Sequence, residues 1–388
     1  VFTLTVLSVI ISGNASIFSN TETLTGGYHV QAGTSYANPI HDIRAALLDV
    51  DGLSPNDLEA IGSFSFGNVD VKQEGSEKDP VDWWIRGLDA GYTDTTSYKF
   101  AMMAEGYESP RQVWEALQEV PGTAVVSAGL VPERSNFNVG DSGPDFSLEG
   151  FFREDDALPE VYIRTADTRT GNEERLRVIG VFKETAFYSS SVMTSQDTLN
   201  NVVGQTVPAR SFIFRLKEPG SADAVAKALE SHFMEYGMQA TDLAEDIRKI
   251  ASTNRVLNTL LQGFMGLGLV VGIAALGVIA ARSVVERRQQ IGVLRALGFQ
   301  RGMVQLSFLL ESSFVALLGI AIGVVLGLAL PYNLVAEIGE DIEGFEYSIP
   351  WANILMVVAI AYGASLLTTF LPARQAARVY PAEALRFE

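Results

Sequence analysis

Residues 282–298 read Arg-Ser-Val-Val-Glu-Arg-Arg-Gln-Gln-Ile-Gly-Val-Leu-Arg-Ala-Leu-Gly, and this basic stretch lies between two long apolar runs. Together with Arg301 it carries five arginines but a single acid, Glu286. A short Arg-rich connection between two membrane spans is expected to face the cytoplasm. Leu294 and Leu297 are three residues apart, so a helix here would have one apolar and one basic face. The stretch is therefore either a topology signal alone or a docking helix for a cytoplasmic partner.

Two motifs in the last third of the chain resemble a known family. The first is Arg287-Arg288-Gln-Gln-Ile-Gly-Val-Leu-Arg-Ala-Leu-Gly298, and the second combines Pro372-Ala373-Arg374 with Pro381-Ala-Glu-Ala-Leu-Arg386. Both resemble FtsX-like permeases, the MacB- and LolC-type membrane subunits of ABC systems. Gln290 stands where the family pattern has an acid, which removes one charge but leaves the apolar face intact. The middle of the chain resembles the family only loosely.

The resemblance implies a partner, an ABC ATPase that binds ATP and docks on this helix from the cytoplasm. The predicted docking residues are Arg287, Arg288, Ile291, Leu294, Arg295 and Leu297. The chain itself contains no Gly-x-x-x-x-Gly-Lys-Ser/Thr, His-Glu-x-x-His or Gly-x-Ser-x-Gly sequence. We therefore predict that it is not an enzyme, carries no cofactor, and depends on an ATPase in a separate chain.

Composition limits the other classes of function. Of 388 residues, 47% are hydrophobic, and the net charge of −18 argues against nucleic-acid binding. Cysteine is absent, which excludes disulfides and thiolate metal sites. The three histidines, His29, His41 and His232, are too far apart in sequence to show ligand spacing.

Three apolar segments predict membrane spans. No charge occurs from Val256 to Ala281 and no proline from Thr241 to Ala281, which predicts one continuous helix of about 60 Å, a stalk followed by a span. The predicted order is stalk and span 241–281, cytoplasmic coupling loop 282–302, span 303–332, outer acidic loop 333–350, span 351–371 and cytoplasmic tail 372–388.

Small residues and one acid are notable within these spans. Gly319, Gly323 and Gly327 recur every four residues, a spacing that favours close helix packing, and Gly268 and Gly272 offer a matching site on the preceding span. Glu311 is the only charge in its span. It is a candidate for an ion-coupling role, although its closeness to the interface and to Arg301 favours an interfacial salt bridge or hydrogen bond.

Residues 13–240 read as a globular α+β domain. Alternating residues over Ser63–Val71 predict a strand with a bulge near Gly67, and Val161–Ile163 with Leu176–Phe182 predict a hairpin. Ser109 before Pro110 predicts a helix N-terminus. The domain weakly resembles the extracytoplasmic domain that MacB-like permeases insert between their first two membrane helices. Residues 1–12 are expected to be a truncated transmembrane helix, the chain being the C-terminal part of a longer one.

The fold class expected is thus an α+β extracytoplasmic domain inserted into an all-α transmembrane bundle, in the cell membrane. The function expected is that of a permease subunit of an ABC exporter or mechanotransmission complex. An FtsX-type regulator of outer partners, such as cell-wall hydrolases, that transports nothing is the alternative. An enzyme carried by the outer domain would need a cluster of acid, base or metal-ligating residues, which the sequence does not show. The expected partners are the ATPase, a second permease copy or an upstream half of the same chain, the lipid bilayer, and an unidentified outer substrate or protein.

Overall fold

The computed structural model describes residues 1–18, 20–35, 37–134, 144–155, 157–183, 191–341 and 347–377. Two compact units divide this part of the chain. The helical unit contains α1, most of α8, and α9, α10 and α11, and the sheet unit begins at Ile17 and ends at Ala251. The outer-loop acids Glu343 and Glu346 and the tail from Arg378 lie outside the described residues.

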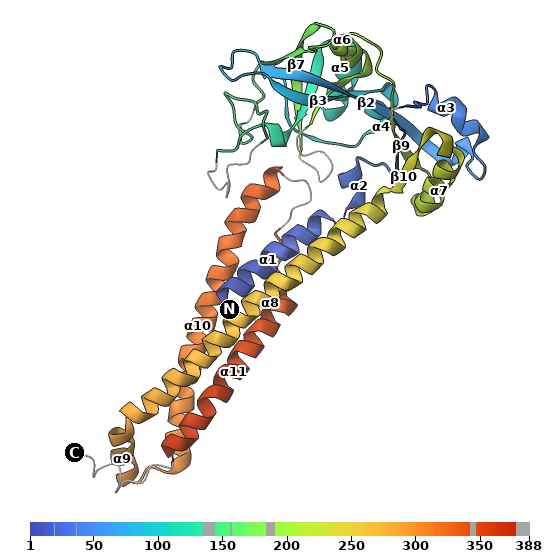
Figure 1. The fold of residues 1–388 in the computed structure, drawn as a ribbon. Coiled ribbons are helices and arrows are strands. Elements are labelled where there is room, and N and C mark those ends of the chain that lie inside the picture. The colour runs from blue at the N-terminus through green and yellow to red at the C-terminus, as the bar shows by residue number, and fades with distance from the viewer. Residues whose placement is uncertain are drawn as a thin grey trace. The chain divides into compact units, whose positions relative to one another are not determined.

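The sheet unit is mixed α+β, as predicted (Figure 1). Its strands are β1 (Val30–Gly33), β2 (Leu58–Gln73), β3 (Val81–Leu88), β4 (Phe100–Met103), β5 (Thr123–Ser127), β6 (Val161–Ala166), β7 (Glu173–Phe182), β8 (Val192–Ser195), β9 (Ser211–Leu216) and β10 (Gln239–Asp242). Its helices are α2 (Thr21–Thr25), α3 (Ile43–Ala46), α4 (Ala90–Thr95), α5 (Pro110–Glu119), α6 (Gln196–Val203) and α7 (Ala222–His232).

One lobe of the sheet unit is a split βαβ arrangement. The strand order β10-β1-β9-β2 is antiparallel throughout, with α3 between β1 and β2 and α7 between β9 and β10. This is the order of a ferredoxin-like sheet. Both helices bury one face against it, and Leu47, Phe212, Phe214 and Leu229 are among the side chains of this core.

The other lobe is a closed ring of strands around a separate core. β2 pairs with β3, β3 with β8, β8 with β5, β5 with β7, β7 with β6, and β6 returns to β2. Closure removes exposed edges from this part of the sheet. The core inside includes Val71, Ile85, Val126 and Ile163, and α5 adds the fully buried Trp114. β2 belongs to both lobes, because its first half pairs with β9 and its last residues pair with β6.

The local predictions in this unit hold except at one glycine. Ser109 caps α5 by accepting a hydrogen bond from the Gln112 N–H, and β6 and β7 form the predicted hairpin. The predicted bulge near Gly67 is wrong, because Gly67 pairs in regular register with Ile85. A Cβ on Gly67 would lie 2.8 Å from Val203, so the glycine is needed where α6 crosses the strand.

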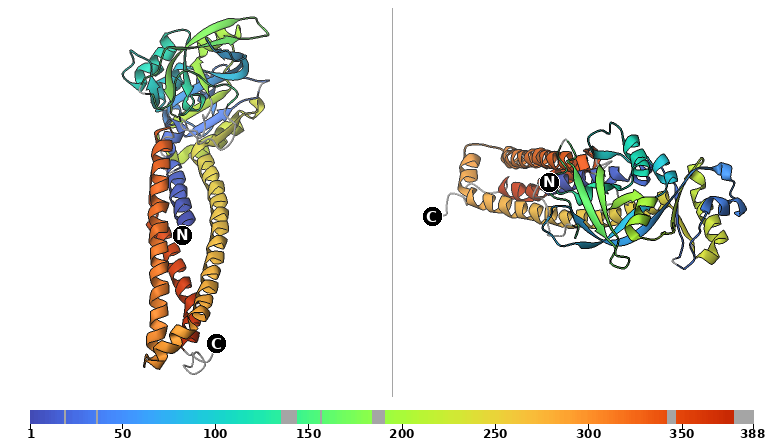
Figure 2. Two further views of the ribbon diagram at one scale, coloured as in Figure 1. Left: turned by 90° about the vertical axis from the view of Figure 1, so that its left-hand side faces the viewer. Right: turned by 90° about the horizontal axis from the view of Figure 1, so that it is seen from above.

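The helical unit consists of α1 (Phe2–Ile17), α8 (Leu243–Glu286), α9 (Arg288–Ala296), α10 (Arg301–Asp341) and α11 (Trp351–Ala377) (Figure 2). Among the described residues, three helices are long and apolar enough to cross a membrane, over Leu243–Ser283, Arg301–Asn333 and Trp351–Gln375. The predicted continuous helix is confirmed as α8, which Asp242 caps through hydrogen bonds from the N–H groups of Ala244 and Glu245. α10 continues beyond Tyr332, where the sequence predicted a loop.

Candidate functional site

The basic stretch forms a separate short helix, α9. The chain turns between Glu286 at the end of α8 and Arg288 at the start of α9. Gly298 ends α9 with a φ of 98°, and the Phe299 N–H bonds to the Leu294 carbonyl at 3.2 Å. This geometry is a glycine C-cap of the Schellman type, which explains the Leu-Gly at the end of the motif.

The side chain of Ile291 in α9 packs against the start of α10. It is 2% exposed and packs with the buried Val304 and with Phe308. Ile291 was predicted to be an anchor for a partner, and the structure corrects this, because a side chain already buried within the chain cannot be inserted into another protein. Val304 and Phe308 are four residues apart on one helix face, the sequence signal that could have identified its partner.

The remaining apolar side chains of this segment are exposed. Leu297 is 73% exposed, and Val293, Phe299 and Leu294 are 46%, 42% and 39% exposed. We call these four residues the α9 apolar face. The side chains of two predicted docking residues, Arg288 and Arg295, lie outside the described residues. A short amphipathic helix of 9 residues with an exposed apolar face suits a shallow groove on another protein.

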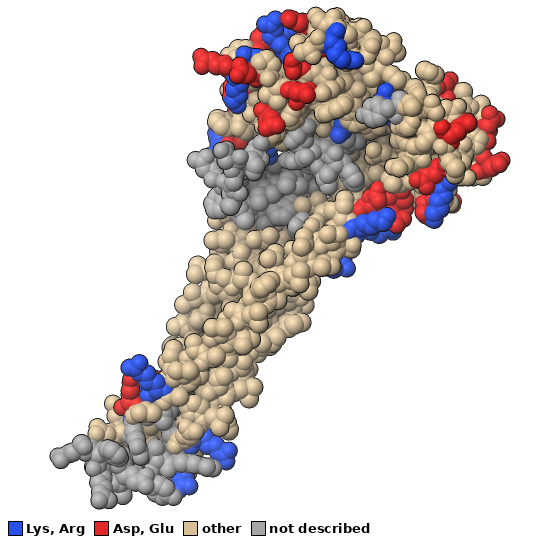
Figure 3. Space-filling view, viewed as in Figure 1, with Lys and Arg blue, Asp and Glu red and all other residues tan. Residues whose placement is uncertain are grey.

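An ion pair also links this region to α10. The Arg287 guanidinium donates to the Glu311 carboxylate at 2.8 Å, and about half of each side chain is exposed. The partner of Glu311 is therefore Arg287 and not the predicted Arg301. Arg282 makes a second pair with Glu286 at 2.6 Å. Figure 3 shows basic and acidic side chains gathered at one end of the helical unit, and the described surface visible above them is uncharged over most of the length of the helices.

The predicted glycine face of α10 contacts a different helix from the one expected. A Cβ on Gly327 would lie 2.7 Å from Thr5 Cβ, and one on Gly323 would lie 3.2 Å from the Phe2 nitrogen, both in α1. Gly319, Gly268 and Gly272 have open space around them. The predicted match between α8 and α10 glycines is thus corrected, since α1 occupies the surface against which Gly323 and Gly327 pack.

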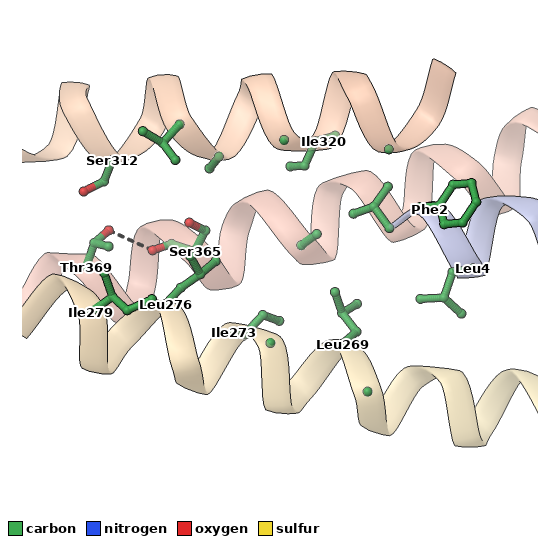
Figure 4. Close-up of a pocket in the computed structure, with 18 of the residues that line it drawn as sticks. Phe2, Leu4, Leu269, Ile273, Leu276, Ile279, Ser312, Ile320, Ser365 and Thr369 are labelled. Atoms are coloured by element: carbon green, nitrogen blue, oxygen red, sulfur yellow. Dashed lines mark hydrogen bonds between the residues drawn. The ribbon is translucent and has the colours of Figure 1, made fainter. Parts of the chain in front are cut away.

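A groove of about 920 Å³ runs between the helices of this unit (Figure 4). Leu269 and Ile273 of α8, Ile320 of α10, and Phe2 and Leu4 of α1 contribute apolar surface. Thr369 of α11 donates its hydroxyl to the Ser365 carbonyl at 2.7 Å, so this polar group is satisfied within its own helix. The carboxylate of Glu311 and the hydroxyls of Ser283 and Ser312 also contribute, so the lining is mainly apolar with a few polar groups.

Within the described residues, no three His, Cys, Asp or Glu side chains are placed to hold a metal ion.

Comparison with known proteins shows what the helical unit is similar to. Residues 263–381 match the model of the FtsX-like permease C-terminal domain. This segment is similar to an FtsX-like permease domain. This match includes α9, the α10 glycines and Glu311.

Known proteins similar to this chain include ABC transporter permeases. The chain is 25% identical to the uncharacterised permease MJ1507 of Methanocaldococcus jannaschii over 58% of each chain, and 26% identical to YknZ of Bacillus subtilis over 56% of this chain and 55% of that protein. It is 29% identical to the macrolide export ATP-binding/permease protein MacB of Neisseria gonorrhoeae over 54% of this chain and 33% of that protein. The chain thus spans little more than half the length of the first two relatives.

Two solved structures are also similar. The extracellular domain of YknZ from Gram-positive bacteria aligns with 55% of this chain and 99% of its own, with a TM-score of 0.34 and 12% identity. The periplasmic region of MacB from Actinobacillus actinomycetemcomitans aligns with 60% of this chain and 97% of its own, with a TM-score of 0.37 and 10% identity.

Proposed function

We propose that this FtsX-like chain is the permease subunit of an ABC exporter or mechanotransmission complex, and that a separate ABC ATPase docks on the α9 apolar face. The observation that carries the proposal is that one apolar side chain of α9 is buried within the chain while its apolar neighbours are exposed. Ile291 is buried against α10, while Leu294 and Leu297 are exposed together with Val293 and Phe299. Apolar side chains held on a fixed helix, at the basic and therefore cytoplasmic end of the helical unit, are suited to a protein partner.

The path of motion would begin in α10 and α11. Movement of α9 would act on α10 through the Ile291 contacts and the Arg287–Glu311 ion pair just before α9, and on α11 because α9 also packs against that helix. α8, continuous from Leu243 to Glu286, would transmit the motion to a sheet unit lying outside the membrane. The mainly apolar groove, in which Glu311 is the one charged lining residue among those described, favours transmission of force over passage of a polar substrate through the helices. Because ABC ATPases close in pairs, a second copy or a second membrane half would supply the other docking helix.

The test is co-purification of the full-length protein from its native membranes, with identification of any bound ATPase and measurement of ATP hydrolysis. We compare the native protein with Leu297→Asp and Leu294→Asp. Leu48→Asp is the matched control, since Leu48 is a leucine of the sheet unit whose exposure (67%) is close to that of Leu297 (73%).

Retention of an ABC ATPase by the native protein and the control, with at least tenfold less in both α9 variants, would support the proposal. Equal retention by all four proteins would refute docking at α9. If no ATPase co-purifies with the native protein, the hypothesis that a partner ATPase drives motion of this chain is refuted. Flux of substrate into membrane vesicles separates an exporter from a regulator that transports nothing.

A further inference from the structure

A second cavity, of about 420 Å³, lies entirely within the sheet unit. It forms where β2 changes partners. β9 pairs with β2 as far as Phe64 and β6 pairs with it from Asp70, so among the described strands none pairs with residues 65–69 on that edge. The turn Asp167–Arg169 after β6 forms one wall, and the loop from Gln205 to Arg210 before β9 forms another.

The outer face of β2 and β3 forms the floor of the cavity. Three cross-strand pairs follow one another there in register: Phe66 opposite Arg86, Asn68 opposite Trp84, and Asp70 opposite Asp82. Val69, Val71 and Ile85 point the other way, into the closed core. The floor is therefore an aromatic surface at one end and a pair of carboxylates at the other.

The two carboxylates, Asp70 and Asp82, lie directly opposite each other on neighbouring strands. Directly opposite like charges on neighbouring strands destabilise a sheet. Within the described part of the chain, neither Asp70 nor Asp82 forms a hydrogen bond or an ion pair. Asp167, in the wall, is different, because it bonds to Arg169 at 3.0 Å and accepts the N–H groups of Arg169 and Thr170. Two arginines, Arg169 and Arg210, also line the cavity, and Arg169 pairs with Asp167. Asp70 and Asp82 are therefore the carboxylates of this cavity with which a cationic ligand could pair.

The aromatic end is suited to the same kind of ligand. Trp84 is 51% exposed, and its ring meets Phe66 edge to face at 6.4 Å. The guanidinium of Arg86 already lies 5.3 Å from the centre of the Phe66 ring, so this surface holds a cation from the protein itself. An exposed indole is the strongest cation–π acceptor among side chains.

We propose that this cavity binds an organic cation, a primary ammonium or guanidinium group on a flat or apolar body. The cationic group lies between Asp70 and Asp82, and the apolar body rests on Trp84. The group could belong to a small amine or to a basic side chain of a protein partner. The site is independent of the docking proposed for α9, because it contains no residue of the helical unit.

The test measures binding of phenethylamine to the full chain in detergent by calorimetry, without ATP or ATPase. Phenethyl alcohol, of nearly the same shape but neutral, and 3-phenylpropionate, which is anionic, are the comparison ligands. A peptide with a single basic residue, acetyl-Gly-Lys-Gly-amide, tests the second source of the cation. The variants are Asp82→Asn, Asp70→Asn and Trp84→Leu, with Asp51→Asn in an exposed turn as the matched control.

We expect the amine to bind at least tenfold more tightly than the alcohol, and each Asp→Asn change in the cavity to weaken it about tenfold. The same two changes should leave the unfolding temperature unchanged or raise it, because they remove repulsion between Asp70 and Asp82. Tighter binding of the peptide than of the amine would assign the site to a protein partner, and the reverse order to a small molecule. Equal binding of amine and alcohol, or native affinity in Asp82→Asn, would overturn the proposal.

Discussion

At the scale of single residues, neighbouring apolar side chains of one motif have opposite roles. Ile291 and Leu297 are both large, apolar and part of the same family pattern, yet their exposed fractions are 2% and 73%. The first contributes to the stability of the helical unit, and the second is available to a partner. Their substitution should therefore separate folding from docking.

Ile291→Ala is expected to destabilise the helical unit by about 2 kcal/mol, the low end for a buried isoleucine, because the cluster with Val304 and Phe308 is small. Leu297→Ala should change stability by less than about 0.5 kcal/mol while weakening ATPase retention. Thermal unfolding in detergent and co-purification measure the two effects. Equal loss of stability in both variants would contradict the assignment.

His29 makes the sheet unit sensitive to acid. Its Nδ1 accepts the Leu216 N–H at 2.9 Å, and burial, followed by the charge of Arg215, lowers the pKa of its imidazole below the usual 6.5. Since the unfolded chain then binds more protons, this contribution to stability is complete above about pH 6.5 and is lost as the pH falls below it.

His29→Gln retains an acceptor for that N–H but does not titrate, so its unfolding temperature should fall less than that of the native protein between pH 7.5 and pH 5.5. His41→Gln is the control. Identical pH profiles for the native protein and His29→Gln would show that another group is responsible.

At the scale of elements, the sequence predicted the features that local interactions determine, and it missed those that depend on packing between distant segments. The α5 cap, the β6–β7 hairpin and the continuous α8 were predicted because local hydrogen bonding and hydrophobic patterning determine them. The partners of Gly323, Gly327 and Glu311 were not predicted correctly. Tertiary packing decides which helices lie side by side, and the sequence pattern of one helix does not show it. The second cavity depends on the register of β2 and β3, which no sequence pattern reveals.

The packing of α1 against α10 gives an element-scale prediction. Gly327→Ala places a methyl group 2.7 Å from Thr5 Cβ and should destabilise the helical unit by about 1–3 kcal/mol. Gly319→Ala, on the same helix face with open space around it, is the matched control and should have no such effect. Unfolding temperatures in detergent decide between them. Two equal temperatures would show that α1 does not pack on Gly327.

At the scale of the whole molecule, the sheet unit and the helical unit are joined by α8, whose course from Leu243 to Glu286 is unbroken. A helix can transmit displacement only while its hydrogen bonds are continuous. An interruption near the boundary between the units should therefore weaken communication while leaving the α9 apolar face in place.

Ser252→Pro removes one helical hydrogen bond and introduces a steric clash, at a cost of about 3 kcal/mol to α8. We expect ATPase retention to persist while any response of the sheet unit to ATP disappears. Since the chain has no cysteine, spin labels on introduced cysteines can report that response. Ser252→Ala should respond as the native protein does. A full response in Ser252→Pro would exclude α8 as the transmitting element.

The pairing of β1 with β10 determines how the sheet unit would yield under load. α8 follows directly from β10, and Val30, where β1 begins, is paired with Asp242, where β10 ends. Tension that draws α8 away from the segment preceding β1 would therefore open this four-residue ladder from one end, one rung after another, as in unzipping. β10 would detach at a lower force than the closed ring of strands can bear. Its detachment would limit the force that reaches the rest of the sheet unit.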